Sequence, residues 1–139
     1  MMCVEDFLDV LNWSEEIGGL EELIRSSKDN LNIIKDWVSS STWADFLCED
    51  LNNLSSTSIC LKLTDAKLIT KSIEIKNIIE KNLTKLLEEN NVAFDIGSYR
   101  SAPPGLRIWG GPTVDKDDIK RLLPWLDWAY HKSLRDLDI

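Results

Sequence analysis

The sequence has a single histidine, His131, and only three cysteines, Cys3, Cys48 and Cys60, which lie far apart. With one histidine and no Cys-x-x-Cys pair, the chain lacks the ligand set of a typical protein metal site. The neighbour of His131 is Lys132, which favours a solvated imidazole, so a Ser-His-Asp or Cys-His catalytic unit is not expected. The odd number of separated cysteines indicates reduced thiols and a cytoplasmic protein.

Long apolar runs and an excess of basic residues are also missing. The longest apolar runs are only a few residues, so we expect no membrane span. Lys and Arg number 16 against 24 Asp and Glu, a net charge of −8, which argues against nucleic-acid binding because that needs a basic face. Gly18-Gly19 and Gly110-Gly111 form neither a P-loop nor a Gly-x-Gly-x-x-Gly turn. The first residues are acidic where a secretory signal is basic, so no signal peptide is expected.

What the chain does have is a globular composition and much tryptophan. Its 139 residues suit one domain, and 43% are hydrophobic while 29% are charged. Six tryptophans stand against three phenylalanines and two tyrosines, which is typical of a packed body with large flat surfaces to bury. We expect Trp109, Trp125 and Trp128 to be core or interface residues.

Apolar spacing predicts four helices. The first covers residues 4–16 and ends at Gly18-Gly19, because glycine readily adopts the left-handed conformation of a helix end. The second covers about 20–39, and the third carries its apolar face from 75 to 87 and stops near Asn90-Asn91. Asp115 is the expected N-cap of the last helix, in which Pro124 predicts a kink.

Three strands are predicted, at 57–64, 92–96 and 106–109. The chain order is then helix, helix, strand, helix, strand, strand, helix. We therefore predict an α+β fold, an α/β two-layer sandwich in which helices cover a small three-stranded sheet. Residues 1–41 form an N-terminal helical arm in this interpretation, because two helices precede the first strand.

One segment has the residue types of an anion site. Arg100 and Arg107 bracket the rigid turn Pro103-Pro104-Gly105. Strand alternation places Arg107 and Trp109 on the face opposite to the neighbouring apolar residues. A guanidinium beside an indole suits a carboxylate or a phosphate, since arginine offers a planar two-pronged donor. The alternative is that Arg107 forms a structural ion pair with one of the many acids.

Three stretches resemble one enzyme family. The run YRSAPPGLRIW, within Gly97–Tyr130, looks like the C-terminal end of the phosphoserine aminotransferases. MMCVEDFLDVLNWSEEIGGL and TSICLK resemble, in turn, the family's helix leading out of its large domain and one of its strands. The resemblance covers essentially the whole chain and implies the small domain of an aminotransferase.

The resemblance also implies a chemistry and its residues. Such enzymes use pyridoxal phosphate and pass an amino group between glutamate and 3-phosphohydroxypyruvate in serine biosynthesis, giving phosphoserine and 2-oxoglutarate. Arg107 falls where the family binds the substrate α-carboxylate, with Trp109 beside it. Arg100, preceded by Tyr99 where many relatives have histidine, falls near the arginine that holds the distal anion. The family's enzymes are homodimers.

The segment that carries the family's cofactor lysine is absent from this sequence. We therefore expect a C-terminal domain, 1–139, that is inactive alone and binds no pyridoxal phosphate by itself. Two further hypotheses remain. The chain is a non-catalytic interaction module, pairing with itself or with a separate large-domain chain through the arm and the tryptophan-rich faces, or it is an unrelated small ligand-binding domain.

Overall fold

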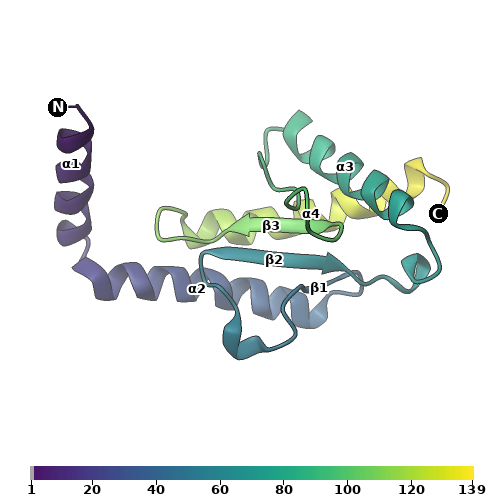
Figure 1. Ribbon diagram of the computed structural model, residues 1–139, viewed down its shortest axis with the longest axis horizontal. Helices are drawn as coiled ribbons and strands as arrows, with labels where there is room; N and C mark the ends of the chain where they lie inside the picture. The colour runs from purple at the N-terminus through teal and green to yellow at the C-terminus, as the bar shows by residue number, and fades with distance from the viewer. Residues whose placement is uncertain (1) are drawn as a thin grey trace.

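The computed structural model describes residues 2–139, in which four helices and a three-stranded sheet follow one another (Figure 1). The elements, in chain order, are α1 (Met2–Glu16), α2 (Gly19–Ser40), β1 (Ala44–Phe46), β2 (Ser58–Leu63), α3 (Ile73–Glu89), β3 (Gly105–Trp109) and α4 (Lys116–Asp136). Two single 3-10 turns, Leu51–Asn53 and Ala66–Leu68, lie on either side of β2. The predicted α+β class is confirmed.

The sheet is antiparallel throughout, with β2 between β1 and β3. The predicted strand at 92–96 is wrong. Asn91 and Asp95 both have positive φ, 54° and 52°, so this stretch cannot run as a regular extended strand. It touches β3 only locally, where the Arg107 N–H donates to the Ile96 carbonyl at 2.8 Å and Gly97 bridges Leu106. The third strand is instead the three-residue β1.

One face of the sheet is buried and the other is largely open. Ile59 and Leu61 of β2 pair with Ile108 and Leu106 of β3, and all four side chains are buried. Helices α2 and α4 pack against each other and α3 packs on α4, which closes the core (Figure 1). The pair Cys60 and Arg107 lies on the open face and is half-buried, and Trp109 on the same face is exposed. This open face carries the candidate site.

Aromatic packing in the core centres on Trp43 rather than on the later tryptophans. The Trp43 indole stacks on the Tyr130 ring, with 4.2 Å between ring centroids, and both side chains are buried. Trp109, Trp125 and Trp128 are 52%, 39% and 36% exposed, so the expectation that they are core residues is wrong. Each lies on a strand or helix position that faces away from the apolar layer. Their alternative role in an interface stays a prediction.

The helix ends follow the local chemistry. Gly18 and Gly19 have φ of 117° and 70°, the left-handed region that the glycine pair predicted between α1 and α2. Asp115 occupies the N-cap of α4, and α4 continues without interruption through Pro124. Asn90 and Asn91 close α3 as expected.

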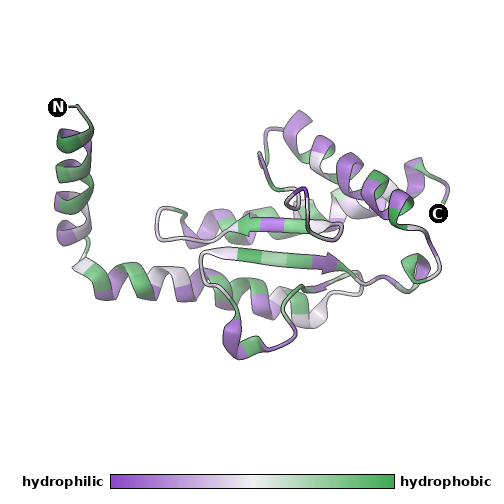
Figure 2. Ribbon diagram, in the orientation of Figure 1, coloured by the Kyte–Doolittle hydropathy of each residue, from purple (hydrophilic) through white to green (hydrophobic). Residues whose placement is uncertain are grey.

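The first helix stands away from the rest of the molecule (Figure 1). No residue of α1 is buried, and its large apolar side chains are exposed to solvent; they include Val4, Phe7, Leu8, Val10 and Leu11. Figure 2 shows hydrophobic and hydrophilic positions along the ribbon of this helix. No helix within residues 2–139 has the length and apolar character needed to cross a bilayer.

Candidate functional site

The alternation of side chains along β3 determines the face on which Arg107 lies. Its neighbours Leu106 and Ile108 are buried, which turns the arginine to the open face, where its side chain is 20% exposed. Gly105, which opens the strand, lies so close to β2 that a Cβ there would collide with the Leu61 carbonyl oxygen. The rigid turn before β3 therefore needs glycine at its last position. This glycine lets β3 start close against β2, with Arg107 two residues further along the strand.

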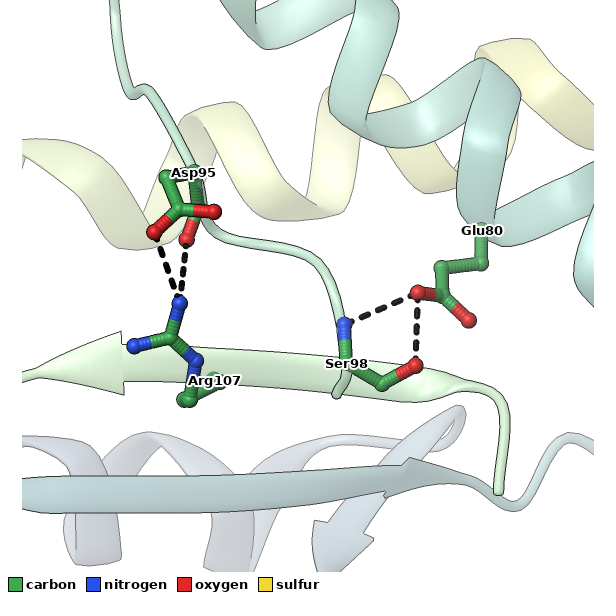
Figure 3. Close-up of polar contacts among 4 residues, drawn as sticks. All are labelled: Glu80, Asp95, Ser98 and Arg107. Atoms are coloured by element: carbon green, nitrogen blue, oxygen red, sulfur yellow. Dashed lines mark hydrogen bonds and ion pairs between the residues drawn. The ribbon is translucent and has the colours of Figure 1, made fainter. Parts of the chain in front are cut away.

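The guanidinium of Arg107 is paired with an acid. Its Nη2 donates to Asp95 Oδ2 at 2.8 Å and to the Asp95 carbonyl at 3.2 Å (Figure 3). The hydrogen bond to Asp95 raises the pKa of Arg107 above its ordinary value, so the group stays charged. Nε is buried and has no hydrogen-bond partner among residues 2–139. The structure thus contains the ion pair that was the alternative to a ligand role for Arg107.

Tyr99 lies against the other side of the same group. The Arg107 guanidinium carbon is 4.5 Å from the centroid of the Tyr99 ring, a cation–π distance. Tyr99 is largely exposed, so its ring covers the arginine from the solvent side. Of the four predicted site residues, these two are brought into direct contact.

Arg100 and Trp109 are placed differently. Arg100 is exposed in the turn and makes no ion pair within 4.0 Å with any residue in the range 2–139. The Trp109 indole N–H donates to Thr113 Oγ1 at 3.4 Å, and its ring lies over Gly111, where a Cβ would have no space. Trp109 still lines the same hollow as Arg107, whereas Arg100 does not.

The loop that carries Tyr99 and Arg100 is fastened to α3 by Glu80. Ser98 donates to Glu80 Oε1 from its backbone N–H and from its hydroxyl, both at 2.8 Å (Figure 3). The Gly105 N–H donates to Glu80 Oε2 at 3.1 Å. One carboxylate therefore holds both ends of the loop 98–105.

A hollow of about 410 Å³ lies beside Arg107, between the edge strand β3, the stretch 92–96 and the first turns of α4. Its lining is mainly apolar, and its charged residues are Arg107, Asp95 and Asp118. A single cation among apolar side chains suits a small ligand with one carboxylate or phosphate at this point. Since two acids face the same hollow, the anion would have to compete with carboxylates of the protein.

Asp95 and Glu80 are the two site residues that the sequence interpretation missed. Asp95 lies 12 positions before Arg107, in the stretch predicted to be a strand. No spacing rule relates its carboxylate to Arg107. Glu80 lies on α3 next to the buried Ile79. An acid beside an apolar stripe is the sequence signal that marks Glu80 as a candidate for a buried hydrogen-bond partner.

The described residues do not make a pyridoxal phosphate site of their own. Such a cofactor needs a lysine for its Schiff base. No lysine within 2–139 is buried, and none lines the hollow beside Arg107. Arg107 is the one basic residue among those that line the hollow.

Comparison with known proteins gives relatives of one kind. No protein-family model matches the chain. Phosphoserine aminotransferase of Methanosarcina barkeri is 45% identical over 133 residues, which is 94% of this chain and 33% of that protein. The enzyme of Methanosarcina mazei is 43% identical over 132 residues, or 94% of this chain and 32% of that protein. The chain therefore spans about a third of the length of these curated relatives.

A solved structure agrees in fold. Phosphoserine aminotransferase from Bacillus circulans subsp. alkalophilus matches with a TM-score of 0.70 over 88% of this chain and 30% of that one, at 24% identity. At this identity the match speaks for the fold alone. The resemblance seen in the motifs is confirmed: the chain is similar to two phosphoserine aminotransferases over 94% of its own length, and it corresponds to about a third of theirs.

Proposed function

We propose that this chain acts as the small, C-terminal domain of a phosphoserine aminotransferase, with residues 1–139 as the domain and 1–41 as its helical arm. The reaction would transfer an amino group between glutamate and 3-phosphohydroxypyruvate in the cytoplasm. The observation that carries the proposal is the 45% identity across 94% of the chain to an enzyme of that name. Arg107 is the residue that would bind the substrate in this function.

In this function Arg107 binds the α-carboxylate of the substrate. A half-buried guanidinium on a strand is held in place by its neighbours, and a carboxylate can bind it with two parallel hydrogen bonds. Tyr99 covers the guanidinium and Trp109 lines the hollow beside it. Arg100, exposed in the adjoining loop, would bind the distal phosphate or carboxylate.

The cofactor would come from elsewhere. Pyridoxal phosphate supplies the electron sink for transamination when it is bound. Since the described residues offer no lysine to hold it, we propose that a large domain provides that lysine and that Arg107 and Arg100 orient the substrate toward it.

Reconstitution tests this function. The chain is co-expressed with the two thirds of the Methanosarcina barkeri enzyme that it does not match, and transamination of 3-phosphohydroxypyruvate by glutamate is measured. We expect activity only when both chains are present. Arg107→Ala should lower kcat/KM by about 100-fold, because a charge-assisted carboxylate contact is lost.

Arg121→Ala is the matched control, because Arg121 is an exposed arginine on α4 and lies outside the hollow. It should leave kcat/KM unchanged. Full activity of the Arg107→Ala variant would contradict the proposed role of Arg107.

A second candidate function, an interaction module, is favoured by α1. This helix exposes an apolar stripe, and all its charged residues are acidic, namely Glu5, Asp6, Asp9, Glu15 and Glu16. Two copies of so acidic a helix repel each other, so a different chain with a basic rim is the better partner.

Co-purification tests this second function. The chain should co-purify with the complementary two thirds of the Methanosarcina barkeri enzyme, and Phe7→Ser with Val10→Ser should abolish this. Asn12→Ser, also an exposed position of α1, is the control and should retain the partner. A concentration-dependent dimer of this chain alone, seen by light scattering and lost in the Phe7→Ser, Val10→Ser variant, would contradict the choice of partner.

A further inference from the structure

The ion pair between Arg107 and Asp95 runs through a single nitrogen of the guanidinium. Nη2 carries two N–H groups, and Asp95 accepts from it twice, through Oδ2 at 2.8 Å and through its carbonyl at 3.2 Å. A guanidinium has two edges that can bind a carboxylate with parallel hydrogen bonds, Nε with Nη2 and Nη1 with Nη2. Both edges include Nη2, so Asp95 contacts the one nitrogen that both two-pronged modes need.

The pair itself is weak enough to be displaced. The Asp95 side chain is 90% exposed, so water solvates its carboxylate whether or not it contacts Arg107. It contacts one nitrogen only and leaves the buried Nε without a partner among residues 2–139. Exposed single-pronged pairs contribute little to stability, whereas a two-pronged carboxylate gains a second hydrogen bond.

The backbone holds Asp95 in this position. Its φ of 52° is in the left-handed region, which glycine or asparagine would fill at similar or lower cost. The carboxylate is therefore not required by the loop conformation, and its visible contact is with Arg107. Asp118, the other acid of the hollow, is engaged with Arg121 at 3.6 Å.

We infer that Asp95 is an internal competitor that sets the anion affinity of Arg107: its carboxylate and carbonyl occupy Nη2 until a substrate carboxylate displaces them. This inference rests on the proposed function, in which Arg107 binds the substrate. The competitor raises the dissociation constant of a two-pronged carboxylate, because only the unpaired fraction of Arg107 offers it a complete edge.

The test measures anion binding by the purified chain. The NMR signal of the Arg107 Nε–Hε group, identified by its loss in Arg107→Lys, is followed while 2-oxoglutarate is added. Asp95→Asn and Asp95→Gly remove the carboxylate and suit the left-handed backbone. We expect both variants to bind 2-oxoglutarate about two- to sixfold more tightly than the unaltered chain.

Asp138→Asn is the matched control. Asp138 also has a positive φ, 55°, is exposed, and forms no ion pair within residues 2–139, so the variant changes the net charge equally. It should bind 2-oxoglutarate like the unaltered chain. Equal affinity in all chains would overturn the role of Asp95 and leave that of Arg107 standing. No response of the Arg107 signal in any chain would overturn both.

Discussion

At the scale of single residues, Asp127 of α4 joins α2 and the segment just before β1 through two indoles. Its carboxylate accepts from Trp43 Nε1 at 2.7 Å and from Trp37 Nε1 at 3.1 Å. Asp127→Ala leaves the N–H of the buried Trp43 without a partner, so we expect the free energy of unfolding to fall by about 2 kcal/mol. Urea unfolding measures this loss.

Asp136→Ala provides the comparison for Asp127, because Asp136 lies on the same helix in an exposed pair with Lys132. Its effect should stay within about 0.5 kcal/mol. Equal losses of unfolding free energy in the two variants would mean that the hydrogen bonds from the indoles to Asp127 do not stabilise the fold.

Tyr130 makes stability depend on alkaline pH. Its hydroxyl donates to Asp65 at 2.8 Å inside the core, and burial, followed by the hydrogen bond to Asp65, raises the pKa of the phenol well above its ordinary value of 10.0. The unfolded chain then loses this proton at lower pH than the folded chain does. The stabilisation is full below about pH 10 and is lost progressively above it.

Urea midpoints at pH 7, 9 and 11 check this expectation. The midpoint should hardly change from pH 7 to 9 and should fall by pH 11, and the fall should be smaller in Tyr130→Phe. If the urea midpoint of Tyr130→Phe falls with pH as much as that of the unaltered chain, groups other than Tyr130 cause the loss of stability at alkaline pH.

At the scale of elements, α3 holds the site loop through Glu80. Glu80→Gln replaces one accepting oxygen by an NH₂ group that faces other donors, so the hydrogen bonds from Ser98 and Gly105 cannot all form. We expect amide exchange at Ser98 and Gly105 to accelerate about tenfold while α3 itself is unchanged.

Hydrogen-exchange NMR makes this measurement, and Glu89→Gln, at an exposed position of α3, is its control. Unaltered exchange at both amides in Glu80→Gln would show that the turn Pro103-Pro104 holds the loop by itself.

The helices could be predicted from the sequence because local signals define them. Gly18-Gly19, Asn90-Asn91 and Asp115 stand where the structure ends or begins a helix. The strands were harder, because β1 has three residues and too few alternations to give a period. The stretch 92–96 has apolar residues in a strand-like pattern, and the left-handed backbone of Asn91 and Asp95 interrupts it.

The site was predictable to the extent that it depends on β3. Alternation along Leu106, Arg107 and Ile108 gives the face of the arginine, and the structure agrees. Its partners come from distant elements, Asp95 from a loop and Glu80 from α3, and no spacing rule joins them to β3. Tertiary packing alone decides these contacts.

At the scale of the whole molecule, α1 contributes little to the stability of the remainder. It buries no residue, and its main packing contact is with α2. Limited proteolysis near Gly18-Gly19 should release residues 1–17, and the body 20–139 should unfold within about 3 °C of the intact chain, because few buried contacts are lost. Differential scanning calorimetry of the purified body measures this. A large drop in Tm would show that α1 stabilises the body.

The left-handed pair Gly18-Gly19 also allows a small change in backbone angle to move the far end of α1 a long way. Fifteen residues at about 1.5 Å each make a rod of roughly 22 Å that is joined to the body at a single point. Because glycine moves between backbone wells at little cost, a turn of roughly 20° at this joint carries the far end through about 8 Å. Helix α1 can therefore change its direction while the sheet and Arg107 keep their geometry.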